Sequence, residues 1–179
     1  MLNFFKKKKE PEYDITNITI HDLDFGFILD YDLKSWVVKE VYEYDWGDNN
    51  FTREYRIDSG DEAAYLAVDD IGELTITVSK AIKIRRIDED FVQIIQDTEK
   101  APRQIHYNSE VYYLESDEAG YSRDLSKDTE DWEEFMSYEY FNEAENKVLS
   151  ITQWDEDSFE AFAGKVVESF QISNILPAD

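Results

Sequence analysis

Alternating hydrophobic and polar positions are the clearest signal in the chain, and they begin in the segment SWVVKEVYEYDW at residues 35–46. In an extended strand, successive side chains point to opposite faces. One face of this segment would carry five large hydrophobic residues, namely Trp36, Val38, Tyr42, Tyr44 and Trp46. The other face would carry Val37, Val41 and charged residues. The pattern predicts a β-strand with one aromatic face.

The segment FTREYRI at residues 51–57 is the predicted partner of this strand in an antiparallel hairpin. Between the two strands lies a run of Gly, Asp and Asn residues, which tolerate the left-handed backbone of a tight turn. A four-residue loop would place Trp46 opposite Phe51, and a two-residue loop would place Tyr44 opposite Tyr55. Either register keeps the aromatic residues on one face, and neither needs the acidic residues of the turn as ligands.

Further strands follow on both sides of the middle of the chain. AAYLAV at 63–68 and ELTITVSKAIKI at 73–84 complete a meander in the first half. In the second half, RQIHY and VYYLES are predicted to form a hairpin across NSE. WEEFMSYEYF and VLSITQW are predicted to form another across NEAENK.

Two segments have patterns that fit both helix and strand. Residues 88–102 favour a short helix that begins at Asp88 and stops before Pro102, although FVQII would also suit a strand. In residues 157–176, the spacing of Phe159, Phe162 and Phe170 fits a helix. The glycine and the paired valines of that segment disfavour a helix, and SFQISNIL alternates like a strand. Helix and strand therefore stay open for 157–176.

Together these elements predict a β-rich fold, mainly antiparallel β with an α+β alternative. We expect meanders and hairpins that form a curved sheet, a small barrel or a sandwich, with one or two short helices. Residues 1–12 form a predicted flexible basic tail, and 13–179 a single β-rich domain. Two sub-halves, at about 13–87 and 103–179, are an alternative division of that domain.

Charge narrows the classes of partner. The chain has 179 residues with 18 Lys and Arg against 42 Asp and Glu, which gives a formal net charge of −24. Such a surface repels phosphate backbones, so we expect no binding to nucleic acid. No run of about 18 apolar residues occurs, so the sequence predicts no membrane span. We expect an acidic cytoplasmic protein.

The usual residues of catalytic and metal sites are scarce. The chain has no cysteine, and its two histidines, His21 and His106, lack a second ligand at helical spacing. The acidic clusters, including Asp22 and Asp24 before Gly26, lack the ligand spacing of a calcium loop. No nucleophile elbow, phosphate loop or dinucleotide fingerprint occurs. We therefore predict no enzyme activity, no metal site and no cofactor.

Two groups of residues are candidate contact sites. The aromatic set of the first hairpin could form a surface for a protein partner, although such a stripe is also typical of a sheet core; it comprises Tyr42, Tyr44, Trp46, Phe51 and Tyr55. The tail could meet a membrane surface, with apolar residues in the interface and lysines at anionic headgroups; its residues are Leu2, Phe4, Phe5, Lys6, Lys7, Lys8 and Lys9. The alternative for the tail is a solvated terminus without this role.

A resemblance to a known family covers about residues 20–177. The segments that carry it are DFGFILDYDLKSWVVKEVYEYDWGDNNFTREYRI, YLAVDDIGELTITVSK, APRQIHYNSEVYYLESDEAGYSRD and LSITQWDEDSFEAFAGKVVESFQISNILP. In these segments the chain resembles a bacterial domain-of-unknown-function family, the one numbered 4178. The resemblance implies a genomic context that includes phage-shock-protein-A-like membrane remodellers, flotillin-like scaffolds and polyamine-biosynthesis enzymes. It implies no catalytic residues.

The leading functional hypothesis is a non-enzymatic accessory module that binds a protein partner in a bacterial cytoplasmic system, in a membrane-stress context. It would stay in the cytoplasm or lie peripherally at the inner face of the membrane through its tail. The alternative is a protein that binds a small cation, either a polyamine or a metal ion, through its acidic body. An enzyme with an unrecognised site ranks third.

Overall fold

A computed structural model describes residues 14, 16–88, 90–127 and 131–178. The strands are β1 (Ile28–Tyr31), β2 (Lys34–Asp45), β3 (Phe51–Asp58), β4 (Ala63–Asp69), β5 (Thr75–Ile82), β6 (Gln104–Tyr107), β7 (Glu110–Asp124), β8 (Glu133–Asn142), β9 (Lys147–Asp155), β10 (Ser158–Val167) and β11 (Ser173–Leu176). The helix α1 (Phe91–Thr98) and the short 3₁₀ helices η1 (Ile20–Asp22), η2 (Ile84–Arg86) and η3 (Ser169–Gln171) complete the described elements. The predicted β-rich class is confirmed.

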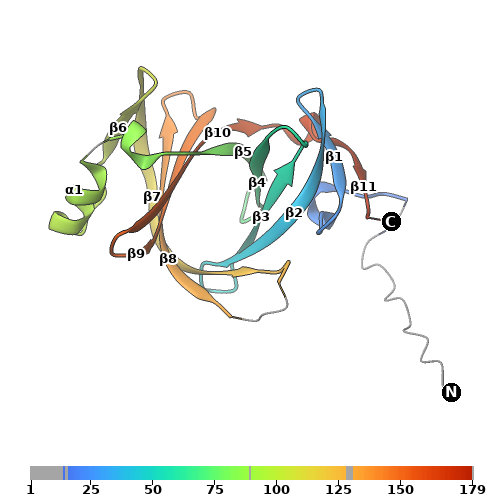
Figure 1. Cartoon of the computed structure of the whole chain (residues 1–179), viewed down its shortest axis with the longest axis horizontal. Helices are drawn as coiled ribbons and strands as arrows, with labels where there is room; N and C mark the ends of the chain where they lie inside the picture. Colours follow the sequence, from blue (N-terminus) through green and yellow to red (C-terminus); the bar gives the residue numbers. More distant parts are fainter. Residues whose placement is uncertain (1–13, 15, 89, 128–130, 179) are drawn as a thin grey trace.

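All strands belong to one antiparallel sheet that curls into a ring. The strand order is β11-β1-β2-β3-β4-β5-β10-β9-β8-β7-β6, and an additional pairing joins β2 to β7. This pairing runs from Tyr42 opposite Asp124 to Asp45 opposite Tyr121. It brings eight strands, β2 to β5 and β7 to β10, into the ring seen in Figure 1. β1 and β11 lie beyond one side of the ring and β6 with α1 beyond the opposite side.

The hydrophobic core lies outside the ring, in two separate clusters. The first covers the outer face of β2 to β5, where elements from both ends of the described chain pack on it. Tyr55, Ile57 and Leu66 belong to it, together with Leu29 of β1 and Ile172 near η3. Burial of these apolar side chains is the main stabilising term on this side.

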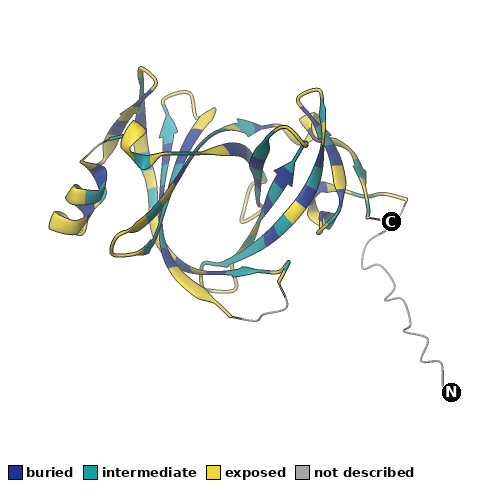
Figure 2. Ribbon diagram, viewed as in Figure 1, coloured by how far each residue is buried: buried dark blue, intermediate teal, exposed yellow. Residues whose placement is uncertain are grey.

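The second cluster holds α1 against the outer face of β8 and β9. Phe91 and Ile95 of the helix belong to one core cluster with Tyr138, Tyr140 and Ile151. The Phe91 ring meets the tyrosine rings edge-on, with centroids 6.0 Å from Tyr138 and 6.4 Å from Tyr140. Along these strands, buried residues alternate with less buried ones (Figure 2). Because successive side chains of a strand point to opposite faces, the residues between the core residues face the interior of the ring.

The predicted single aromatic face of the first strand is wrong, because β2 contains a β-bulge. Val38 pairs with Ile57, but the next pair is Glu40 with Arg56, so Lys39 is an extra residue. A bulge of one residue exchanges the two faces of the strand beyond it. Trp36 and Val38 therefore share the outer core with Val41, while Tyr42, Tyr44 and Trp46 turn to the opposite face.

The hairpin register differs from both predicted registers by an odd number of residues. Tyr44 lies opposite Thr52, and Asp45 lies opposite Phe51. This register separates Phe51 and Tyr55 from the aromatic residues of β2. The turn itself follows the predicted turn chemistry: Gly47, Asp48 and Asn49 all adopt positive φ, at 84°, 52° and 65°. The Asp45 carboxylate accepts a 2.9 Å hydrogen bond from the Gly47 N–H.

The structure resolves both ambiguous segments. Residues 91–98 form the predicted helix, which ends where Glu99 takes a left-handed backbone with φ 53°. Residues 157–176 form strands β10 and β11, which are joined through η3. Residues 158–167 form a strand because this conformation places Ala161 and Val167 in the outer core while Phe162 faces the interior of the ring. The predicted pairs 103–107 with 111–116 and 132–141 with 148–154 are present as β6–β7 and β8–β9.

Gly164 lets β10 approach β5 closely, and a larger residue there should destabilise the ring. A Cβ atom at Gly164 would lie 2.6 Å from the Val78 carbonyl oxygen and 2.6 Å from the Ser79 Cβ. Gly164→Ala should therefore lower the free energy of unfolding by about 1–3 kcal/mol, the usual range for overpacking. Urea denaturation measures this. Ser158→Ala at the exposed start of the same strand should change it by less than about 0.5 kcal/mol, and equal effects would contradict the close approach.

Candidate functional site

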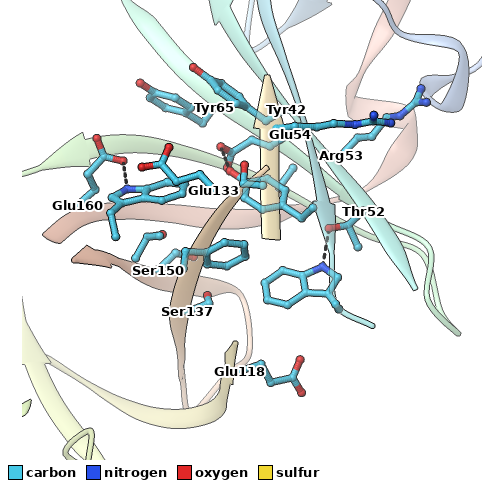
Figure 3. A pocket seen from close by; sticks show the side chains of 18 of the residues that line it. Tyr42, Thr52, Arg53, Glu54, Tyr65, Glu118, Glu133, Ser137, Ser150 and Glu160 are labelled. Atoms are coloured by element: carbon cyan, nitrogen blue, oxygen red, sulfur yellow. Dashed lines mark hydrogen bonds between the residues drawn. The ribbon is translucent and has the colours of Figure 1, made fainter. Parts of the chain in front are cut away.

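The interior of the ring is a polar cavity of about 1310 Å³, lined by residues of β2, β3, β4, β7, β8, β9 and β10 (Figure 3). Its volume exceeds the roughly 300–1,000 Å³ of ordinary small-molecule pockets. The side chains reach it through the same alternation that builds the outer core. On β3, Thr52 and Glu54 face inward while Tyr55 faces outward. On β8, Ser137 and Glu139 face inward while Tyr138 and Tyr140 face outward.

Carboxylates dominate the charge of the lining, and three glutamates form no ion pair with another described residue. The glutamates of the lining are Glu54, Glu118, Glu133, Glu139 and Glu160. The basic residues of the lining are paired with other acids: Arg123 binds Glu43, and Lys127 lies 2.9 Å from Asp124, which is itself part of the lining. Arg53 also approaches Glu43, at 3.7 Å. Within the described residues, no ion pair reaches Glu54, Glu139 or Glu160.

Glu54 is the most perturbed of these groups. It keeps a little accessible surface toward the cavity, but protein atoms surround it, and this burial raises its pKa to about 7. The negative charges of Glu139 and Glu160 act in the same direction. The Tyr44 hydroxyl donates a 3.1 Å hydrogen bond to Glu54 Oε1, which lowers the pKa by less than burial raises it. The carboxyl group is therefore held in a site that disfavours an isolated negative charge.

Glu139 shows the same behaviour on the other side of the ring. Burial is the main cause of its raised pKa, and the Ser150 hydroxyl, which donates a 3.3 Å hydrogen bond to Oε1, only partly offsets it. Glu160 is more exposed and accepts a 3.0 Å hydrogen bond from the Trp154 indole N–H. Three carboxyl groups from β3, β8 and β10 thus share one cavity with mutual repulsion between Glu54 and each of the others.

Aromatic rings form the second component of the lining. Phe135 is the centre of one group, with its centroid 5.4 Å from Tyr44, 5.2 Å from Trp46 and 5.6 Å from Trp154. The Trp46 indole N–H is satisfied by the Thr52 hydroxyl at 2.9 Å. Tyr65 and Phe162 form a second pair, 4.8 Å apart. Aromatic rings attract ammonium groups, and so do carboxylates that have no ion pair with a described basic residue.

Comparison with known proteins agrees with the resemblance seen in the sequence. Residues 24–169 match the family described as "Domain of unknown function (DUF4178)". The chain belongs to this family. An "Uncharacterized protein" from Aquifex aeolicus (strain VF5) is 25% identical over 176 residues, which covers 97% of this chain and 94% of that protein. No solved structure matches the chain significantly.

In this family member, the predicted partner-binding residues lie in three different places. Tyr42, Tyr44 and Trp46 line the cavity inside the ring. Tyr55 is only 1% exposed and belongs to the outer core, and Phe51 is 41% exposed at the start of β3. The set therefore does not form one surface. Its role toward a protein partner stays a prediction.

The other predicted sites lie elsewhere. The membrane-contact residues Leu2 to Lys9 fall outside the described residues. His21 is exposed and lies 3.7 Å from Asp70, His106 is exposed on β6, and neither is among the described residues of the cavity lining. In the described ranges, no group of three or more histidine and carboxylate residues is placed to hold a metal ion. Nor does any helix there have the length and apolarity needed to cross a bilayer.

The sequence analysis did not identify Glu54 and Glu139 as candidate site residues, because they are two among 42 acidic residues. A local signal does exist. In FTREYRI the polar residues Thr52 and Glu54 alternate with Tyr55 and Ile57, and in FMSYEYF the residues Ser137 and Glu139 alternate with Tyr138 and Tyr140. A glutamate on the face opposite the apolar side chains of a strand faces a confined space once the strands are known to close into a ring.

Proposed function

We propose that the protein is a non-enzymatic binding protein that holds a small organic cation, such as a polyamine, inside the strand ring. The observation that carries the proposal is the pair Glu54 and Glu139. Both carboxyl groups face the cavity, and both are shielded from bulk water enough to raise their pKa. A bound ammonium group would supply the positive charge that none of the described residues places beside them.

The aromatic part of the lining favours an organic cation. Ammonium groups gain about 0.5–2 kcal/mol from the face of a tyrosine or tryptophan ring, and methylene chains gain from apolar contact. Tyr44, Trp46, Phe135 and Trp154 supply such rings next to the carboxylates. The overall charge of −24 raises the local concentration of any cation and speeds its association.

Calorimetric titration with spermidine at physiological salt tests the proposal. We expect a saturable heat that persists at this salt, because the interacting charges lie inside the ring and are screened little. The double variant Glu54→Gln with Glu139→Gln should weaken binding at least about tenfold, since removal of one partner of a buried charge pair costs about 2–5 kcal/mol. Both substitutions keep the shape of the side chain.

Glu134→Gln is the matched control, because Glu134 is an exposed acid next to the lining residue Glu133 on β8 and is absent from the described cavity lining. It removes one negative charge, as each substitution of the double variant does, and should leave spermidine affinity unchanged. Heat that vanishes on addition of salt, or an equal loss of affinity in the control, would identify counterion exchange on the acidic surface and contradict a site in the ring.

A further inference from the structure

Glu54 lies at the centre of a crowded inner face. On β3 it stands between Tyr42 of β2 and Ala67 of β4 in the strand register. The Tyr44 hydroxyl, at 3.1 Å, is its hydrogen-bond donor among the described residues. One row further along the same face stands the basic residue Arg56, which is paired with Glu40 at 3.5 Å. The positive charge of Arg56 is therefore already matched.

The remaining groups that face Glu54 are acidic or aromatic. Tyr65 of β4 lies in the Arg56 row, and the Tyr42 hydroxyl donates a 2.5 Å hydrogen bond to Glu40. Across the cavity, Glu139 of β8 and Glu160 of β10 add negative potential at Glu54. No element packed against Glu54 in the described chain thus brings an unmatched positive charge to it.

A carboxyl group in such a place has two ways to avoid an uncompensated buried charge: it can keep its proton or it can face a cation. In the ligand-free protein it keeps the proton over much of the neutral range, because burial raises the pKa of Glu54 to about 7. A cation in the cavity would stabilise the ionised form and bring the pKa back down.

We propose that cation binding in the ring expels the proton of Glu54 to the solvent, so that the proton and the ligand occupy this site alternately. The proposal rests on the proposed function and adds a regulatory property to it. The Tyr44 hydroxyl can serve either state, since it donates to the carboxylate and to the carbonyl oxygen of the carboxylic acid. Acidification releases the ligand, and a rise in pH retains it.

The direction and size of the effect follow from linkage. Above about pH 8 Glu54 is already ionised and binding displaces no proton. At pH 7 binding releases about half a proton, and at pH 6 about 0.9 of one. The dissociation constant should accordingly rise about tenfold from pH 8 to pH 6. The amines of the ligand titrate in the same way with either protein, so a difference in pH dependence between the wild-type protein and Glu54→Gln belongs to Glu54.

The test is calorimetric titration of spermidine into the full chain at pH 6, 7 and 8, in two buffers with different enthalpies of ionisation at each pH. The difference between buffers counts the protons released. We expect the release and the affinity change stated above for the wild-type protein. In Glu54→Gln the affinity should change less than about threefold over the same range, with proton release near zero. Glu134→Gln should behave as wild type.

Three other outcomes of these titrations would contradict the proton coupling, and one of them would also contradict the proposed function. Saturable binding with the same affinity and no proton release at all three pH values would overturn the coupling while leaving the binding proposal intact. A pH dependence that survives in Glu54→Gln would also overturn it, because another group would then carry the proton. An absence of saturable binding at every pH would overturn the proposed function and this inference with it.

Discussion

At pH 8 the variant Glu54→Gln should be more stable than the wild-type protein by about 3 kcal/mol in the free energy of unfolding. Glu54 has a pKa of about 7 in the folded protein against an ordinary value of 4.5, and each pKa unit corresponds to about 1.36 kcal/mol. Ionising the buried carboxyl group therefore destabilises the folded state. Glutamine keeps the shape of the side chain and can still accept the Tyr44 hydrogen bond, but it carries no charge.

The sign of the pH dependence follows from which state holds the proton more tightly. Between about pH 4.5 and 7 the folded protein keeps the Glu54 proton and the unfolded chain loses it. Stability therefore falls as pH rises through this window, and the loss is complete above it. Below about pH 4 both states are protonated, so wild type and variant should there have nearly equal stability.

Urea denaturation of the ligand-free proteins at pH 4, 6 and 8 measures this effect. The gap between variant and wild type should open with rising pH, and Glu134→Gln should show no such gap. A variant that is less stable than wild type at pH 8 would mean that Glu54 has a compensating charge in the folded protein. That result would remove the main physical reason to place a cation at this site.

The variant Phe91→Ala should lose about 3–5 kcal/mol of stability, the usual cost of removing a large aromatic side chain from a core. Phe91 is fully buried, and its ring bridges α1 to Tyr138 and Tyr140 on the outer face of β8. The loss should be accompanied by faster proteolysis of the segment around α1, because this contact holds the helix to the ring.

Phe170→Ala is the control for this experiment, because the Phe170 side chain is 79% exposed in η3. Its stability should change by less than about 0.5 kcal/mol. A small effect of Phe91→Ala, similar to that of the control, would contradict the view that the core lies outside the ring and that the interior is free for a ligand.

The strands could be predicted from the sequence because their alternation is local. Residues 73–84 carry a period-2 pattern, and residues 63–68 and 148–154 are short runs rich in apolar residues. None of these patterns needs distant information, and the structure confirms strands in these segments as β5, β4 and β9. The short helix at 91–98 was likewise predicted from Asp88 and Pro102 as its boundaries. The resemblance carried by the Trp36 strand and the Gln153-Trp154 pair led to the correct family.

The closure of the ring and the content of its interior could not be predicted in the same way. They depend on a bulge at Lys39, on a hairpin register shifted by an odd number of residues, and on the pairing of Tyr42 with Asp124 far along the chain. A slip of one residue exchanges the faces of a strand, so the sequence pattern alone left open which aromatic residues are buried. The two half-buried glutamates Glu54 and Glu139 could be recognised only once the ring placed them in one cavity.

A ring with its core outside and acidic groups inside also explains why the aromatic residues of the first hairpin were ambiguous. Tyr55 packs in the outer core, whereas Tyr44 and Trp46 face the cavity. The two groups differ in this way although β2 and β3 are paired with each other. A platform for a protein partner and a sheet core were the two alternatives for these residues. The lining of a ligand cavity is the third arrangement, and it needs strands that curl back on themselves.

The most direct test of the binding site is an NMR measurement of contacts between bound spermidine and the protein. Intermolecular nuclear Overhauser effects report protons that lie close together, so they locate the ligand rather than its affinity. We predict contacts from the spermidine methylene protons to the ring protons of Tyr44, Trp46 and Phe135, which line the cavity. Contacts confined to exposed side chains such as Phe170, with none to these three rings, would contradict an organic-cation site inside the ring.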